Sequence, residues 1–292
     1  RLEGLPRLIV SPRNLLSSCS TSAFQISLMS LNPFASPSSL GDRRSGMEEF
    51  EQILQRINYP TKIYNFCYIE NFGVYFEPGV FDDVPCYQTI CADIAQLVRL
   101  LPSGALQKLQ KDTHIYINKT LTYETLRFFE MGRNCCYHPR DETQWLKDRG
   151  LALEKRGCVE INNLEDYLSS IHLWGTGGLL AHEFSHAYHD KFCYSGFDNA
   201  VINEAYNVTM RKKLYDNVRV HGPQGLAADG VTSITAKAYA CADCKEFFAE
   251  LSVAYLYALD AHTEYNKWFP FNRAQLETYD RESFSVIESM WI

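Results

Sequence analysis

The residues with the clearest chemical potential are His182, Glu183 and His186, which form the pattern His-Glu-x-x-His. On an α-helix, residues four apart are rotated by about 400°, so both imidazoles project from one face, one turn apart. There they can bind one metal ion, and Glu183 lies beside the open coordination position. Its carboxylate can polarise a metal-bound water and pass the proton to a leaving amine. The motif therefore predicts a metal-dependent hydrolase.

A catalytic zinc site needs a third protein ligand, for which three glutamates are candidates. The metzincin ligand, a histidine six residues past His186, is absent. Glu246 is favoured because it shares one face of an otherwise apolar helix with Glu250, and paired carboxylates on such a face need a nearby cation. Glu250 is better suited to orient a ligand histidine by hydrogen bonding. Glu204 follows His186 by 18 residues, as in thermolysin-like enzymes, but the aspartate expected after it is missing.

Three weaker features accompany the motif. Asp190, at the end of the same helix, either orients an imidazole or is an exposed charge. Cys241 and Cys244 have the spacing of half a structural zinc site, but no second pair matches them, so reduced core cysteines are favoured. A glycine-rich segment, 175–178, lacks the Lys-Ser/Thr ending of a phosphate-binding loop and is interpreted as the entry to the metal-binding helix.

The elements that must position these residues follow from the apolar spacing. In the first half, the pattern predicts strands at 69–76, 114–118 and 157–161 and helices at 87–101 and 105–110. The second half is helical, with helices expected at 178–190, 198–215, 245–259, 273–279 and 281–290, the first of them capped by Thr176. Strands followed by helices indicate an α+β domain with a cleft between two lobes.

Composition limits the partners. The chain has 292 residues and a net charge of −7, and an acidic surface repels phosphate backbones, so nucleic acid is not an expected partner. No apolar run approaches the roughly 18 residues of a membrane-spanning helix, so no membrane span is expected. The expected partner is a peptide or protein substrate; the sequence leaves the oligomeric state open.

The first 46 residues differ from the rest. Residues 1–46 contain five arginines, two acidic residues and eleven serines, a composition typical of organelle transit peptides. We interpret them as a disordered leader or targeting segment and residues 47–292 as one catalytic domain. An intracellular location, cytoplasmic or in an organelle, is favoured; secretion stays possible, since Asn118 and Asn207 lie in glycosylation sequons.

Beyond the motif, the sequence resembles a known family. The segment 182–190, followed by Glu246-Phe-Phe-Ala-Glu250 with Tyr239 seven residues before Glu246, resembles the catalytic domain of anthrax lethal factor. It is more similar still to a group of fungal, plant and protist zincin proteins that includes conidiation-specific ones. The resemblance runs from about residue 59 to residue 292 and includes the segments 157–161, 186–190, 238–240 and 269–273, continuing through Trp291.

The resemblance implies an α+β, zincin-like single domain, with a small mixed-sheet lobe carrying the active-site helix and a helical C-terminal lobe. It implies that His182, His186 and Glu246 bind one Zn²⁺ per chain, that Glu183 is the general base, and that Tyr239 stabilises the oxyanion. The expected activity is zinc-dependent endopeptidase cleavage. The alternative is a catalytically inactive zincin that keeps its metal as a structural or binding element.

Overall fold

The computed structural model describes residues 64–119, 135–148, 151–170, 174–221, 233–257 and 266–292. These residues form a mixed α+β structure, so the expected α+β class is confirmed. The predicted leader, residues 1–46, lies outside the described residues. Among the described residues, no helix is both long enough and apolar enough to cross a membrane.

One five-stranded mixed sheet forms the first lobe. Its strands stand in the order β1-β2-β3-β5-β4. β2, β3 and β5 run parallel to one another, whereas β1 and β4 each pair antiparallel with their neighbour. The strand order places β1 at one edge of the sheet and β4 at the other. The strands are β1 (Asn65–Ile69), β2 (Phe72–Phe76), β3 (Ile115–Ile117), β4 (Cys135–Tyr137) and β5 (Val159–Ile161).

The expected single strand at 69–76 is wrong. The chain turns at Glu70 and Asn71, which have φ values of 49° and 63°, and a hairpin of β1 and β2 results. Two successive residues with positive φ are the geometry of a type I′ turn, which matches the twist of the flanking strands. β4 was not predicted, because Cys135, Cys136 and Tyr137 do not alternate between apolar and polar residues, whereas the equally short β5 does.

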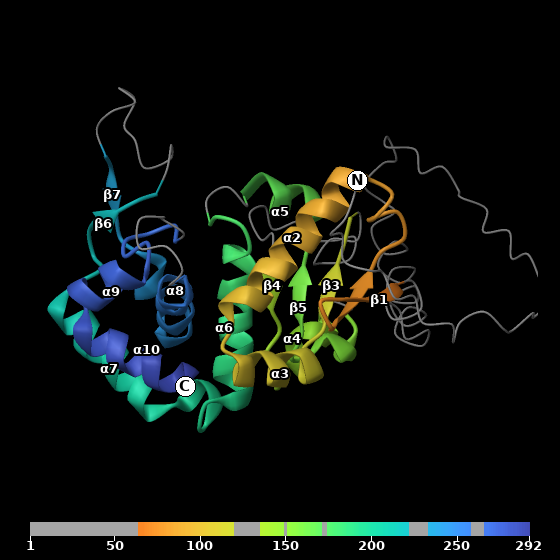
Figure 1. Ribbon diagram of the computed structural model, residues 1–292. Coiled ribbons are helices and arrows are strands. Elements are labelled where there is room, and N and C mark those ends of the chain that lie inside the picture. The colour runs from red at the N-terminus through yellow and green to blue at the C-terminus, as the bar shows by residue number, and fades with distance from the viewer. Residues whose placement is uncertain (1–63, 120–134, 149–150, 171–173, 222–232, 258–265) are drawn as a thin grey trace, which may run out of the picture.

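Helices cover one face of this sheet. Figure 1 shows α2 (Val84–Leu100) crossing in front of the strands, beside α6 (Gly178–Phe192), with α3 (Ser103–Asp112) below. The helices cover a row of fully buried apolar side chains: Val74, Ile115, Ile117, Val159 and Ile161. Two short helices, α4 (Thr143–Asp148) and α5 (Leu164–Ser170), were not predicted; they flank β5 in the chain.

The second lobe is helical, as expected. It contains α7 (Ala200–Lys212), α8 (Cys244–Leu256), α9 (Arg273–Tyr279), α10 (Arg281–Trp291) and a two-stranded sheet of β6 (Val218–Arg219) and β7 (Thr235–Ala236). α6 and α8 lie side by side where the lobes meet (Figure 1). The Trp291 ring of α10 stacks on Tyr188 of α6, with centroids 4.2 Å apart.

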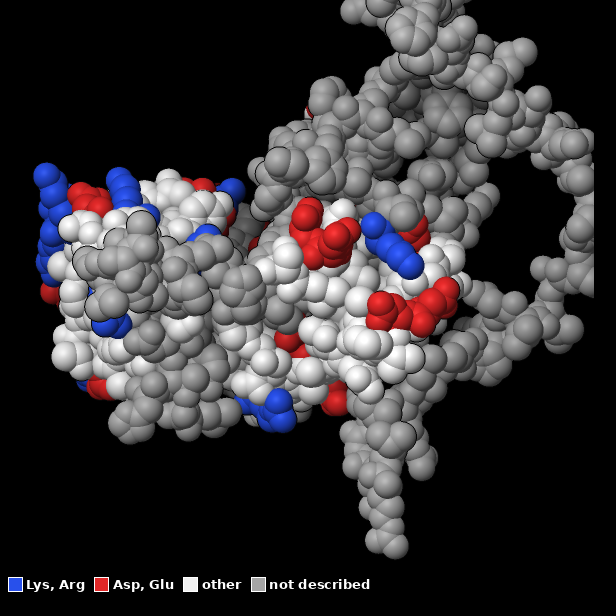
Figure 2. Space-filling model, turned by 90° about the horizontal axis from the view of Figure 1, so that it is seen from above, with Lys and Arg blue, Asp and Glu red and all other residues white. Residues whose placement is uncertain are grey.

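The long helices lie close to where apolar spacing placed them. α7 is shorter than the expected helix at 198–215, because Lys213 adopts a left-handed conformation, with φ of 56°, and ends it. The expected helix at 245–259 forms α8, which ends at Leu256. On the face in Figure 2, Lys and Arg lie among Asp and Glu rather than in one continuous basic surface.

Candidate metal centre

The helix that carries the motif, α6, is buried from Gly178 to Asp190. Thr176 does not cap it, contrary to expectation; the N-cap is Gly177, with φ of 75°. The Gly177 N–H donates instead to Oδ1 of Asp93 on α2, at 2.9 Å. Any other residue at position 177 would be strained by the positive φ, and its Cβ would crowd the Asp93 carbonyl oxygen at 3.0 Å.

The candidate for the third ligand comes from α8. Asp243 caps this helix by accepting hydrogen bonds from the backbone N–H groups of Lys245 and Glu246, which places Glu246 in the first turn. Since α6 and α8 pack side by side, the Glu246 carboxylate meets the imidazoles of His182 and His186. Its Oε2 lies 3.1 Å from His182 Nε2 and 3.2 Å from His186 Nε2, and the two Nε2 atoms are 3.1 Å apart.

These three distances fit a metal ion. Ligand atoms bound tetrahedrally at about 2.0–2.1 Å are separated from one another by about 3.3 Å. The two histidine nitrogens and the Glu246 oxygen form a nearly equilateral triangle of almost that edge. A triangle of three ligands leaves the fourth tetrahedral position open, as catalytic sites require. Among the described residues, this group can therefore hold a metal ion.

Glu250, one turn after Glu246, supports the same conclusion. Its carboxylate is 1% exposed, and Oε1 lies 3.2 Å from His182 Nδ1, an ion-pair contact that is not aligned as a hydrogen bond. A histidine that binds metal through Nε2 carries its proton on Nδ1 and usually donates it to a carboxylate. Glu250 therefore occupies the position of an orienting group, as the sequence favoured, and not that of a third ligand.

The environment shifts the pKa values of these groups. Burial disfavours a charged His182, but hydrogen bonding to Glu246 and contact with Glu250 raise its pKa well above the usual range. Burial would raise the pKa of Glu246, yet its hydrogen bonds to the two imidazoles lower it. Burial raises the pKa of Glu183, against the opposing effect of both histidines. A carboxylate with a raised pKa is a stronger base, which suits Glu183 to proton transfer.

Aromatic side chains border the centre. Tyr239, in a 3₁₀ turn at Tyr239–Cys241, is 44% exposed, and its hydroxyl donates to Glu246 Oε1 at 3.1 Å. The Tyr239 ring stacks near His182, with centroids 6.4 Å apart, while Trp174 meets the same imidazole edge-on at 5.3 Å. The hydroxyl of Tyr239 thus lies beside one of the three candidate ligands, on a residue that is partly exposed to solvent.

Other residues singled out from the sequence lie elsewhere. Glu204 is exposed on α7 and pairs with Arg211. Asp190 is neither an exposed charge nor an imidazole-orienting group: it is buried and accepts hydrogen bonds from the Tyr137 hydroxyl at 2.7 Å and the Arg140 N–H at 3.0 Å. It therefore ties α6 to the β4 strand and to the residues that follow it.

The two cysteines between Tyr239 and Glu246 are not bonded to each other. Cys241 and Cys244 are both free thiols and partly buried. The described residues contain no disulfide, and Cys19 lies outside them. The pair between Tyr239 and Glu246 therefore does not form a bond that constrains the metal centre.

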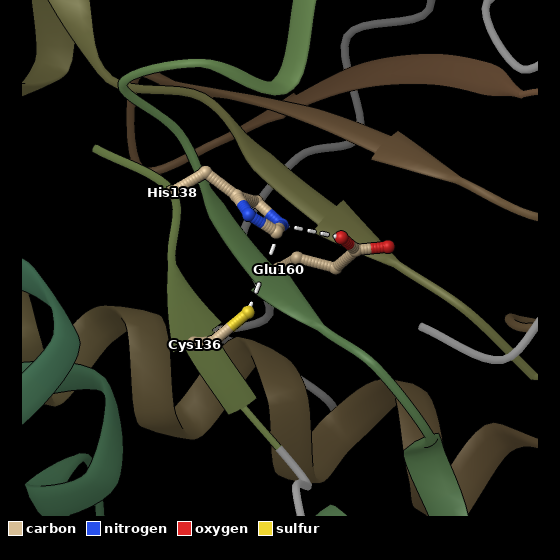
Figure 3. Close-up of side chains that lie close together, drawn as sticks. All are labelled: Cys136, His138 and Glu160. Carbon is tan, nitrogen blue, oxygen red and sulfur yellow. Dashed lines mark hydrogen bonds and ion pairs between the residues drawn. The ribbon is translucent and has the colours of Figure 1, made fainter. Parts of the chain in front are cut away.

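Sequence reasoning missed a second group of possible ligands on the sheet. Cys136, His138 and Glu160 point toward one another from β4, the residue after it, and β5 (Figure 3). Cys136 Sγ lies 3.6 Å from His138 Nε2, which lies 2.6 Å from Glu160 Oε2. Only a Cys-x-His pattern at 136–138 could have drawn notice, since the pairing of β4 with β5 is not readable from the sequence.

Comparison with known proteins adds no assignment: no family model matches the sequence, and no curated protein matches it. The interpretation therefore depends on geometry. Of the residues predicted for catalysis and metal binding, the structure brings together all five: His182, Glu183, His186, Tyr239 and Glu246. Of the other two candidates for the third ligand, Glu204 lies apart from this group on α7, and Glu250 contacts the second nitrogen of His182.

Proposed function

We propose that this chain is a zinc-dependent peptidase with a zincin-like fold, in which His182, His186 and Glu246 hold the ion. The observation that carries the proposal is the triangle of two imidazole nitrogens and one carboxylate oxygen with edges of 3.1–3.2 Å. Two histidines and one glutamate form the ligand set of thermolysin-type zinc sites. The resemblance to the catalytic domain of anthrax lethal factor supports the same assignment.

The chemistry divides between the ion and the protein. Zinc bound there would act as a Lewis acid toward a carbonyl oxygen and lower the pKa of a water molecule. Glu183 accepts the proton of the attacking water and returns it to the departing amine nitrogen. Tyr239 donates its hydroxyl proton in a hydrogen bond to the oxyanion of the substrate. Glu250 holds the His182 ring in the orientation that directs Nε2 to the ion.

The sheet offers a place for an extended peptide. β4 forms one edge of the described sheet and packs against α6. A peptide that paired with this edge would run beside the helix that carries His182 and Glu183, and its carbonyl groups would lie near the metal centre. This arrangement favours a peptide or protein as the substrate over a small molecule.

The proposal is tested by metal content and cleavage of a peptide library. We expect the wild type, expressed with ample zinc, to retain the ion and cleave peptides in a chelator-sensitive way. Glu183→Gln should keep the zinc and lose cleavage, whereas His186→Ala should lose both. Glu204→Gln, on the exposed surface of α7, is the matched control and should change neither.

Two results would contradict the proposal. Less than about a tenth of an equivalent of zinc in the wild type would exclude the metal centre itself. Full zinc content without cleavage of any library peptide would favour the alternative, a zincin-like protein that uses its metal for structure or binding. The proximity of Glu183 and Tyr239 to the triangle supports the enzyme over this alternative.

A further inference from the structure

A second group of possible metal ligands, Cys136, His138 and Glu160, lies on the opposite face of the sheet from α6. Successive residues of a strand point to opposite faces. Tyr137 points toward α6, where its hydroxyl contacts Asp190, so Cys136 points away from that helix. Cys136 pairs with Glu160 across β4 and β5, which brings thiol and carboxylate to the same face (Figure 3).

The distances in this group suit a tetrahedral ion. Zinc bonds of about 2.3 Å to sulfur and about 2.0 Å to nitrogen separate the two ligand atoms by about 3.5 Å. Cys136 Sγ and His138 Nε2 are 3.6 Å apart. Glu160 Oε2 lies 2.6 Å from the same nitrogen, a hydrogen bond that would lengthen by less than about 1 Å on metal binding.

The three ligand atoms lie within 4.8 Å of one another, and the remaining polar atoms of His138 and Glu160 have other partners. Lys155 and Asn118 both donate to Glu160 Oε1, so Oε2 is the oxygen that faces His138. The other His138 nitrogen, Nδ1, lies 3.7 Å from a Glu142 carboxylate oxygen. Metal-binding histidines and carboxylates commonly have such partners on their remaining atoms.

Asn162 gives a separate indication. This side chain is 1% exposed; its Oδ1 lies 3.4 Å from Cys136 Sγ, and its Nδ2 has no hydrogen-bond partner. A buried N–H without a partner is costly. A metal-bound cysteine is a thiolate, which accepts hydrogen bonds, and a rotated Asn162 amide would then donate Nδ2–H to that sulfur.

We propose that Cys136, His138 and Glu160 bind a second divalent ion, Zn²⁺ or another metal that accepts sulfur, separate from the centre on α6. The thiolate and the carboxylate together offset the charge of the ion, and Lys155 keeps its contact with the other carboxylate oxygen. The ion holds β4 against β5. Tyr137, between two of the ligands, contacts Asp190, so the second ion stiffens the strand beside the first centre.

Cobalt substitution distinguishes the two centres, because only the second has a sulfur ligand. We expect the wild-type protein to bind about two equivalents of Co²⁺ and to show a sulfur-to-cobalt charge-transfer band. Cys136→Ser should lose that band and one equivalent. A variant with His182→Ala and His186→Ala should lose the other equivalent and keep the band. Cys86→Ser, on the first turn of α2, is the matched control and should keep both.

The wild-type spectrum needs no variant, so the test does not depend on how well Cys136→Ser folds. Absence of the band at saturating Co²⁺ overturns the proposal and leaves Lys155, Glu160 and His138 as a buried ion-pair network. Persistence of the band in Cys136→Ser, with circular dichroism unchanged, also overturns it, because the sulfur ligand would then be another cysteine. If the variant with His182→Ala and His186→Ala binds as many equivalents of Co²⁺ as the wild type, only the first centre is contradicted.

Discussion

Asp93 is a buried acid, and burying its ionised carboxylate lowers the stability of the fold. It lies on α2 with no solvent exposure, and its two oxygens accept hydrogen bonds from the Gly177 N–H at 2.9 Å and the Tyr167 hydroxyl at 2.6 Å. Burial raises its pKa from 3.8 to about 6, although both hydrogen bonds act in the opposite direction. Since Gly177 is the N-cap of α6, the protonation state of this carboxyl bears on the start of that helix.

The pKa shift fixes the direction and size of an effect on stability. The folded-state pKa lies above the unfolded one, so the contribution of Asp93 to stability is fully present below about pH 4 and is lost as the pH rises through about 6. About two pKa units, at 1.36 kcal/mol each, amount to about 3 kcal/mol. In Asp93→Asn the amide oxygen still accepts from Gly177, its N–H group can donate to the Tyr167 oxygen, and no charge is buried.

Urea unfolding of both proteins, followed by circular dichroism, measures this effect. When the pH is raised from about 4 to about 7.5, the free energy of unfolding of the wild type should fall by up to about 3 kcal/mol relative to that of Asp93→Asn. The variant should therefore gain stability relative to the wild type at the higher pH. Asp82→Asn, at an exposed position, should follow the wild type at both pH values. Parallel behaviour of Asp93→Asn and the wild type would refute the reasoning.

Three further predictions follow from the contacts around α6 and α8. Glu250→Gln should weaken zinc binding by about 10- to 100-fold, measured by chelator competition, since the contact with His182 Nδ1 loses its charge. Tyr239→Phe should lower kcat by about 100-fold with zinc retained, measured by steady-state kinetics. Trp291→Ala should lower the free energy of unfolding by about 3–5 kcal/mol in a urea titration, because its stacked ring is 2% exposed, whereas Ile292→Ala, at 95% exposure, should have little effect.

Each of these predictions has a contrary result. Unchanged zinc affinity in Glu250→Gln would mean that the carboxylate does not orient His182. A loss of zinc in Tyr239→Phe would assign the hydroxyl to holding Glu246, which it contacts at 3.1 Å, rather than to the oxyanion. Equal stability of Trp291→Ala and the wild type would show that the stacking on Tyr188 contributes little to the junction of the lobes.

The helices could be predicted because their apolar spacing is long and regular. Each of the helices α2, α6, α8 and α10 buries at least one face against the core. Apolar residues therefore recur at helical spacing over three or more turns, which makes the helix recognisable in the sequence. β4 could not be predicted, since Cys135, Cys136 and Tyr137 show no alternation of apolar and polar residues. The hairpin at Glu70 and Asn71 was missed because neither residue is glycine, although an asparagine tolerates positive φ better than most residues do.

The first metal centre could be predicted in part because helical spacing fixes the relation of His182 and His186 to each other. The choice of Glu246 needed a second argument, that two carboxylates on an apolar helix require a cation. The second group could not be found in this way. Cys136 and Glu160 lie 24 positions apart in the chain, and only the register of β4 against β5 makes them neighbours.

The burial of charged groups at the junction of α6 and α8 argues for a cation at this place. Glu183 and Glu250 are 7% and 1% exposed, and His182 between them is 4% exposed. Two buried carboxylates and two imidazoles would be costly without a cation, whereas an ion at the triangle offsets their charge and directs each ring. Two helices could pack through apolar side chains alone, without burying carboxylates and imidazoles. The presence of these groups at the junction is therefore best explained by a bound ion.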